Sequence, residues 1–183
     1  MKLKLLILVL ALQTAWLFAT VATQEYVPNH GTVILLETRR VDPRDMLRGD
    51  YLILNYKISD VPASMFSSPL KKDSLFGANI FVALAPGTNG FYEVTRAATN
   101  EFTPAAGELL LHGIQAYACW NTTSAVHVDY GIEKYFVAEG TGNPTGKLTV
   151  QVVVPASGRP TNQQVFVDGK SYACAMKDSS ARR

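Results

Sequence analysis

After its first two dozen residues, the chain consists mainly of short apolar and β-branched runs separated by turn residues. Residues 32–38 and 51–58 are two such runs. Successive side chains of a strand point to opposite faces of the sheet. The second run therefore predicts one core face, made of Leu52, Leu54, Tyr56 and Ile58. By the same rule, the run at 125–130 predicts a core face made of Val126, Val128 and Tyr130.

Two turn signals predict hairpins. Residues 79–85 and 91–96 are strand-like and flank the loop Pro-Gly-Thr-Asn-Gly at 86–90. Asp168-Gly169 separates residues 164–167 from 170–173. This dipeptide favours a type I′ turn, because both central positions of that turn need a positive φ.

The remaining apolar runs complete the prediction of an all-β fold. Further strands are expected within residues 109–118, 125–130 and 147–154, and helical signals are limited to single turns at 62–66 and 131–135. Short strands at this spacing are typical of a sandwich or a closed barrel. We expect a single domain of about eight strands over residues 25–177, in either architecture, followed by a polar tail at 178–183.

The first 24 residues predict an export signal or a membrane anchor. Lys2 and Lys4 precede an apolar run from residue 5 to residue 22, interrupted only by Gln13, Thr14 and Thr20. A signal peptide cleaved near Ala22 and an uncleaved helical anchor both agree with this pattern. The length of the run favours the anchor. In either case the body of the protein lies outside the cytoplasm, with the two lysines on the cytoplasmic side.

The charge balance argues against a nucleic-acid partner. The chain has 17 Lys and Arg residues and 15 Asp and Glu residues, and Lys2 and Lys4 account for the whole excess. The body is thus neutral, whereas nucleic-acid-binding domains usually carry a clustered basic surface. The hydrophobic content of 48% is sufficient for a packed core.

The cysteine content agrees with export. Cys119 and Cys174 form an even pair in a chain expected to enter an oxidising compartment, where disulfides persist. A disulfide between them is one interpretation, and two separate thiols are the other.

A motif at residues 49–56 carries a family resemblance. The segment reads Gly49-Asp50-Tyr51-Leu52-Ile53-Leu54-Asn55-Tyr56. It resembles the signature of the GDYXXLXY protein family, with all five fixed positions present. Residues 41–45 with Arg48, and residues 130–136, resemble the flanking part of the motif and a second block of that family. The resemblance extends over nearly the whole chain.

The resemblance implies a location and a partner, but no particular activity. It implies a bacterial protein of the inner membrane, with one span and a periplasmic C-terminal domain, or a periplasmic protein after cleavage. Because members are often encoded beside multi-span membrane proteins, it also implies a multi-span membrane protein as the partner.

The residues of the two blocks support two interpretations. In the first they are structural: Pro43 and Gly49 shape a turn, and the role extends to Tyr51, Leu54, Tyr56 and Gly131. In the second they line a polar binding pocket made of Arg44, Arg48, Asp50, Tyr130 and Glu133. The N-terminal segment, the neutral body and the lack of a catalytic motif favour a non-catalytic binding or accessory module. The alternative is a hydrolase or small-ligand enzyme that uses Asp50 and Glu133 for acid–base chemistry.

Other catalytic signals are weak. The sequence contains neither a G-x-S-x-G nucleophile elbow nor a P-loop nor a dinucleotide-binding fingerprint. His127 and Asp129 share one strand face, but two ligands do not make a metal site. We therefore predict no metal and no cofactor.

Overall fold

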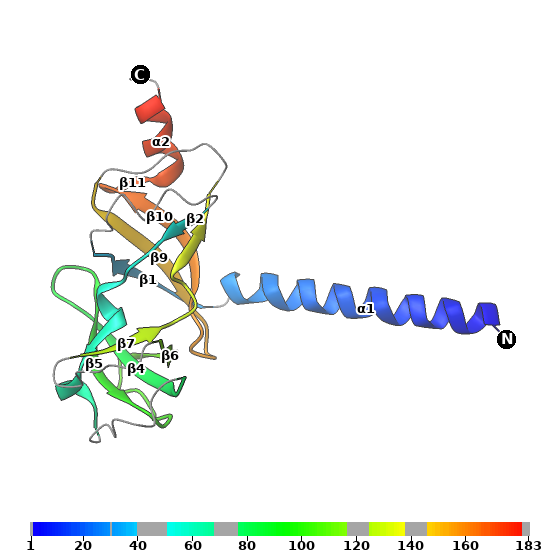
Figure 1. The fold of residues 1–183 in the computed structure, drawn as a ribbon, viewed down its shortest axis with the longest axis horizontal. Coiled ribbons are helices and arrows are strands. Elements are labelled where there is room, and N and C mark those ends of the chain that lie inside the picture. Colours follow the sequence, from blue (N-terminus) through cyan, green and yellow to red (C-terminus); the bar gives the residue numbers. More distant parts are fainter. Residues whose placement is uncertain are drawn as a thin grey trace.

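The computed structural model describes residues 2–29, 31–39, 51–67, 77–116, 125–137 and 146–180. A long N-terminal helix, α1 (Lys2–Asn29), precedes a β-rich body, and a short helix, α2 (Tyr172–Ser180), follows the last strand. Figure 1 shows α1 projecting away from the body and α2 at one end of it. The prediction of an all-β domain after an N-terminal hydrophobic helix is confirmed.

The described part of the body contains eleven strands in three antiparallel sheets, and these do not close into a barrel. The four-stranded sheet has the order β1 (Thr32–Glu37), β9 (Leu148–Val154), β10 (Thr161–Val167) and β11 (Lys170–Ser171). A two-stranded sheet pairs β2 (Tyr51–Ile53) with β8 (Lys134–Phe136). The five-stranded sheet has the order β3 (Asp60–Pro62), β7 (Ala125–Asp129), β6 (Leu109–Gln115), β4 (Asn79–Pro86) and β5 (Tyr92–Ala98). Two single turns of 3-10 helix, η2 (Lys57–Ser59) and η3 (Ala63–Met65), flank β3.

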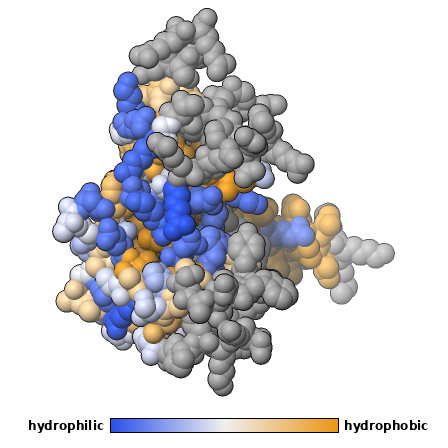
Figure 2. All heavy atoms as spheres, turned by 60° about the vertical axis from the view of Figure 1, so that its left-hand side comes forward, coloured by the Kyte–Doolittle hydropathy of each residue, from blue (hydrophilic) through white to orange (hydrophobic). Residues whose placement is uncertain are grey.

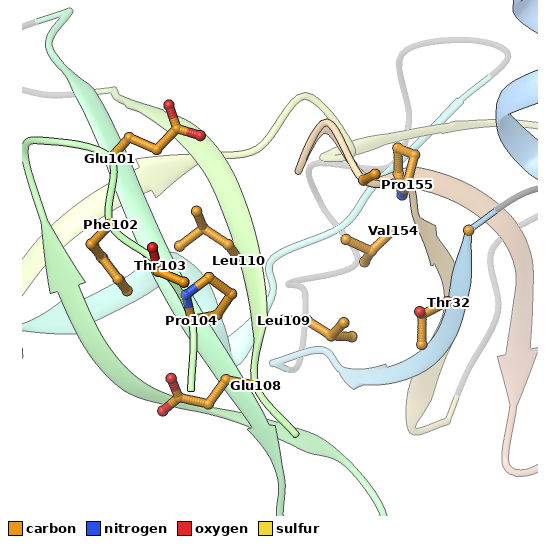
Figure 3. A pocket seen from close by; sticks show the side chains of 12 residues that line it. Thr32, Glu101, Phe102, Thr103, Pro104, Glu108, Leu109, Leu110, Val154 and Pro155 are labelled. Carbon is orange, nitrogen blue, oxygen red and sulfur yellow. The ribbon is translucent and has the colours of Figure 1, made fainter. Parts of the chain in front are cut away.

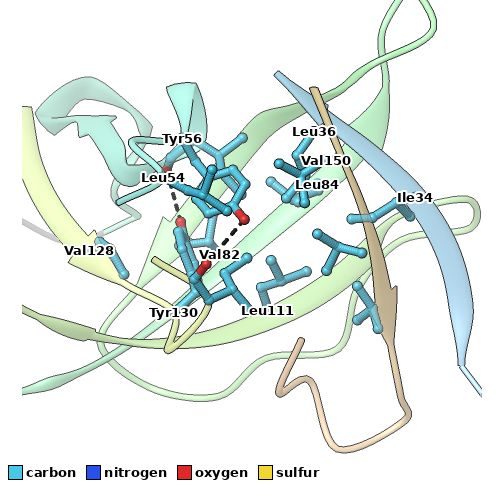
Figure 4. Close-up of a cluster of buried hydrophobic side chains, with 14 of the residues drawn as sticks. Ile34, Leu36, Leu54, Tyr56, Val82, Leu84, Leu111, Val128, Tyr130 and Val150 are labelled. Atoms are coloured by element: carbon cyan, nitrogen blue, oxygen red, sulfur yellow. Dashed lines mark hydrogen bonds between the residues drawn. The ribbon is translucent and has the colours of Figure 1, made fainter. Parts of the chain in front are cut away.

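The core lies between the sheets and has the face pattern that the sequence predicts. Leu52, Leu54, Tyr56 and Ile58 are all buried, while the residues between them are exposed or half-buried. Figure 4 shows Leu54 and Tyr56 in one cluster with residues of the other two sheets, such as Leu36, Val82 and Leu111. Alternation along residues 51–58 therefore places one apolar row in a shared core.

Both predicted hairpins are present. β4 pairs with β5 around a loop in which Gly90 has a φ of 81°. β10 pairs with β11 through Asp168 and Gly169, whose φ values are 47° and 81°. Both central residues thus have the positive φ that the type I′ turn requires.

The strand expected at residues 170–173 is shorter than predicted. β11 ends at Ser171, and α2 begins at Tyr172. Tyr172 and Met176 lie one helical turn apart and are only 6% and 7% exposed. Their burial against the core stabilises a helix that the local sequence does not signal clearly.

Helix α1 contains an apolar segment that does not pack against the body. This segment, Lys4–Val21, is long and apolar enough to cross a membrane, and none of it is buried. Figure 2 shows the apolar surface of the helix beside a body whose visible face carries many polar residues. Length and composition thus fit both an anchor and a signal sequence.

Candidate functional site

The two sequence blocks that resemble family motifs lie side by side. β2 comes from the first block and β8 from the second, and their ladder pairs Tyr51 with Phe136. The backbone N–H of Leu54 extends this pairing by donating to the Glu133 carbonyl at 2.7 Å. The two blocks, some eighty positions apart in the sequence, form one local structure.

Two tyrosines tie the inner side of this structure to the core (Figure 4). The Tyr56 hydroxyl lies 3.1 Å from the Ile132 carbonyl oxygen, and the Tyr130 hydroxyl donates to the Ile58 carbonyl at 2.9 Å. Burial, and secondarily the negative charge of Glu133, raises the pKa of both phenols well above its ordinary value. Both therefore remain protonated donors at neutral pH, which suits a structural role.

Asn162, at the start of β10, joins the same network. Its Nδ2 atom donates to the carbonyl oxygens of Ile132 at 2.7 Å and Lys134 at 3.3 Å. Its Oδ1 atom accepts from the Tyr56 hydroxyl at 2.8 Å. Sequence reasoning missed this residue, because a single Asn within a strand has no local signature. The pairing of β10 with β9 shifts register immediately after Asn162.

The turn before β8 contains two of the predicted site residues. Gly131 has a φ of 80°, which favours glycine. The Glu133 carboxylate accepts from the Tyr130 backbone N–H at 2.6 Å. The Glu133 carboxylate thus binds a turn amide, and a pocket lined by Tyr130 and Glu133 stays a prediction.

The rest of the predicted pocket lies outside the described residues. This holds for Arg44, Arg48 and Asp50, and also for Pro43 and Gly49. Whether Asp50 and Glu133 converge on one pocket, as the enzyme hypothesis requires, stays a prediction.

The outer side of the β2–β8 pair presents aromatic and basic side chains. The rings of Tyr51 and Phe136 lie 6.3 Å apart, and the Lys134 Nζ atom lies 5.4 Å from the centre of the Tyr51 ring. Phe136 is 76% exposed. Beside it is a groove of about 350 Å³, lined by β8, the preceding Gly131 and Ile132, and residues 160–162.

A larger groove, of about 840 Å³, opens where α1 joins the body (Figure 3). Gly31 and Thr32 line it from the start of β1, opposite residues 101–104 and 108–110. Glu108 on its wall is already paired with Arg96, at 3.1 Å. The lining is mixed, and the described contacts do not select one ligand chemistry.

His127 belongs to an ion-pair cluster. Its Nδ1 atom lies 2.6 Å from Asp60 Oδ1, and its Nε2 atom lies 3.6 Å from Asp129 Oδ1. Arg39 also pairs with Asp60, which links the end of β1 to β3. Within the described ranges, no group of three or more His, Cys, Asp or Glu residues is arranged to hold a metal ion.

The disulfide interpretation of Cys119 and Cys174 is not confirmed. Cys174 lies exposed on α2 with a free thiol. Cys119 lies outside the described residues. The Cys174 thiol is thus accessible to thiol-labelling reagents.

Comparison with known proteins gives one match. The family model described as GDYXXLXY protein matches residues 13–165, which include part of α1 and both blocks. No curated protein and no solved structure matches the chain.

Proposed function

The chain belongs to the GDYXXLXY protein family, and from this premise we propose that it is a membrane-anchored binding or accessory module. Helix α1 is the anchor in the bacterial inner membrane. The β-rich body lies in the periplasm and engages a multi-span membrane protein. The module acts by binding, without a reaction of its own.

One observation carries the proposal: the apolar segment of α1 is entirely unburied. The 18 residues Lys4–Val21 make no packed interface with the body. Exposing this much apolar surface to water would cost roughly 25 cal/mol for each Å². A lipid bilayer removes that cost, and 18 residues are within the range that spans its apolar core.

The native Cys174 allows a direct test of orientation. In a Cys119→Ala chain expressed in bacterial cells, Cys174 is the remaining thiol. We expect a membrane-impermeant maleimide to label it in intact spheroplasts. Adding Cys174→Ala and Lys4→Cys gives the matched control, which should react only after lysis. Labelling of Cys174 only after lysis would contradict a periplasmic body.

Extraction with alkaline carbonate tests the anchor separately. We expect the full-length chain of 20.0 kDa to remain in the membrane pellet. A shortened chain in the soluble fraction would instead show that the N-terminal segment is a cleaved signal peptide, and would overturn the anchored form of the proposal.

Affinity purification tests the partner. The bait is the full chain, purified from detergent-solubilised membranes, and the control bait is residues 1–29 fused to an unrelated periplasmic domain. We expect the full chain to enrich a multi-span membrane protein over the control. Equal recovery with both baits would contradict the binding role of the body.

A further inference from the structure

We propose that the free edge of β8 binds an extended acidic segment of the membrane partner as an added β-strand. This inference rests on the proposed function and assigns its binding surface. It follows from the direction of the backbone groups, the side chains beside them and the groove along that edge.

The backbone of β8 has one edge that pairs with β2 and one edge that faces away from it. In an antiparallel ladder, the N–H and C=O groups of successive residues point alternately toward and away from the neighbouring strand. The Glu133 carbonyl faces the first block, because it accepts from Leu54 N–H. The backbone groups of Lys134 and Phe136 therefore face away from β2. β8 has no second strand beside it among the described residues.

Asn162 confirms the direction of this edge and occupies part of it. Its amide donates to the Ile132 and Lys134 carbonyls, which are the alternate acceptors expected there. Beyond Asn162, the N–H and C=O of Phe136 have no backbone partner among the described residues. Two open groups in extended geometry select another extended polypeptide rather than a lipid or a small anion.

The groove beside the edge indicates which side chains of that polypeptide would fit. Lys134 is the one charged residue among the described groove-lining residues, so a carboxylate is the complementary group. Phe136 lies two residues further, on the same face, and is 76% exposed. An acidic residue followed two positions later by an apolar one fits this spacing, because an added strand repeats the same alternation.

The edge is short, so we expect weak binding of the added strand. Anchoring of both proteins in one membrane would compensate for this weakness. The two open groups of Phe136 provide about two hydrogen bonds, and each contributes on the order of 1 kcal/mol. Two proteins anchored in one membrane meet at a raised effective concentration, so a weak strand addition can still be occupied.

The test uses the full chain in lipid nanodiscs and a defined fluorescent probe. The probe is a capped octapeptide that alternates threonine with glutamate and valine, read by fluorescence anisotropy. We expect a dissociation constant on the order of 0.1 to 1 mM. The matched control peptide is N-methylated at alternate residues, which removes the donors, and it should not bind. No saturable binding of the unmethylated probe up to several millimolar would overturn the inference.

Two substitutions at one position separate backbone from side chain. Phe136→Ala removes the ring, and Phe136→Pro also removes an N–H that the β2 ladder does not use. Proline is tolerated at such outward-facing edge positions. We expect about tenfold weaker binding to the proline variant than to the alanine variant, with the same Tm for both. Equal affinities would overturn strand addition.

Charge reversal tests the acidic character of the segment. Lys134→Glu should lose affinity for the glutamate probe about threefold to tenfold and gain it for a lysine probe. Lys170→Glu, at another exposed lysine on β11, should leave both affinities unchanged. The same loss with both variants would show non-specific attraction and overturn the assignment to β8.

Two further outcomes distinguish this inference from the proposed function. If the full chain enriches a membrane protein but Phe136→Pro enriches it equally, the edge assignment fails and the binding module stands. If the chain instead forms dimers that Phe136→Pro abolishes, the occupant is a second copy, and the inference of a foreign acidic segment is wrong.

Discussion

The two faces of the β2–β8 pair differ sharply in what their side chains do. On the inner face, Leu54 and Tyr56 are almost completely buried and join the core of both larger sheets. On the outer face, the half-buried Tyr51 and the exposed Phe136 form an aromatic pair beside Lys134. The GDYXXLXY signature contributes to both. The same motif thus supplies core residues, Leu54 and Tyr56, and an outer-face residue, Tyr51.

The comparison predicts that inner-face changes cost the most stability. Leu54 is 0% exposed. Leu54→Ala should lower the free energy of unfolding by about 2–5 kcal/mol, through lost burial and a residual cavity. Urea denaturation of the full chain in detergent measures this change. Asn55→Ala, at the exposed neighbouring position, is the control, and equal losses for both variants would remove the distinction between the faces.

A smaller loss is expected when a buried hydroxyl is removed. Tyr130→Phe leaves the Ile58 carbonyl without the donor it now has. The expected loss is about 1–3 kcal/mol. The control is Tyr135→Phe, because the Tyr135 hydroxyl makes no hydrogen bond with the described residues and should be worth less than about 0.5 kcal/mol. The same urea denaturation assay measures both variants. An unchanged free energy of unfolding for Tyr130→Phe would show that the bond to Ile58 adds no net stability.

The ion pairs of Glu37 lie outside both faces, and they should make a modest, pH-dependent contribution to the free energy of unfolding. Lys147, and then Lys57, hydrogen-bonds the Glu37 carboxylate at 2.5 Å and lowers the pKa of Glu37 below its ordinary value of 4.5. A lowered folded-state pKa gives stability that is present above pH 4.5 and is lost as the pH falls through the folded-state pKa.

Glu37→Gln should therefore cost about 0.5 kcal/mol at pH 7, discounted for screening because both lysines are more than half exposed. The difference from wild type should vanish in strong acid. Unfolding followed from pH 7 to pH 2 measures it. A difference that grows toward acid would contradict this sign.

The smallest effect is expected on the outer face. Phe136→Ala removes a side chain that is 76% exposed, so the free energy of unfolding should change by less than about 0.5 kcal/mol. Leu52→Ala, on the buried side of the facing strand, is the matched contrast and should cost several times more. If Phe136→Ala proves as costly as Leu52→Ala, the outer face is part of the fold and the comparison fails.

Local patterns in the sequence predicted the features that depend on neighbouring residues. Strand alternation identified the buried face of residues 51–58, and Asp168-Gly169 identified a turn with two positive φ values. The four-residue spacing of Tyr172 and Met176 is typical of a helix. It was overlooked because residues 170–173 were assigned to a strand and a polar tail follows soon after. A helix of nine residues depends on tertiary packing more than on its own propensity.

The pairing of the two blocks could not be predicted. The bond from Leu54 to Glu133 joins distant positions, and the register of such a ladder depends on the whole core. Asn162 was missed for the same reason, since its role comes from two carbonyl groups, one on β8 and one just before it. The resemblance to a family identified both blocks, but one sequence gives no distance between them.

The junction between α1 and β1 has a mechanical consequence. The helix ends at Asn29 and the strand begins at Thr32. A Cβ at Gly31 would overlap Val153 and lie 2.8 Å from the Val154 carbonyl oxygen, so the chain at Gly31 is tightly packed against β9. Residues 22–29 add about 12 Å of helix beyond the apolar segment. With α1 in a bilayer, the two residues between helix and strand leave little chain length. The body therefore stays close to the membrane surface, and only partners near that surface come within its reach.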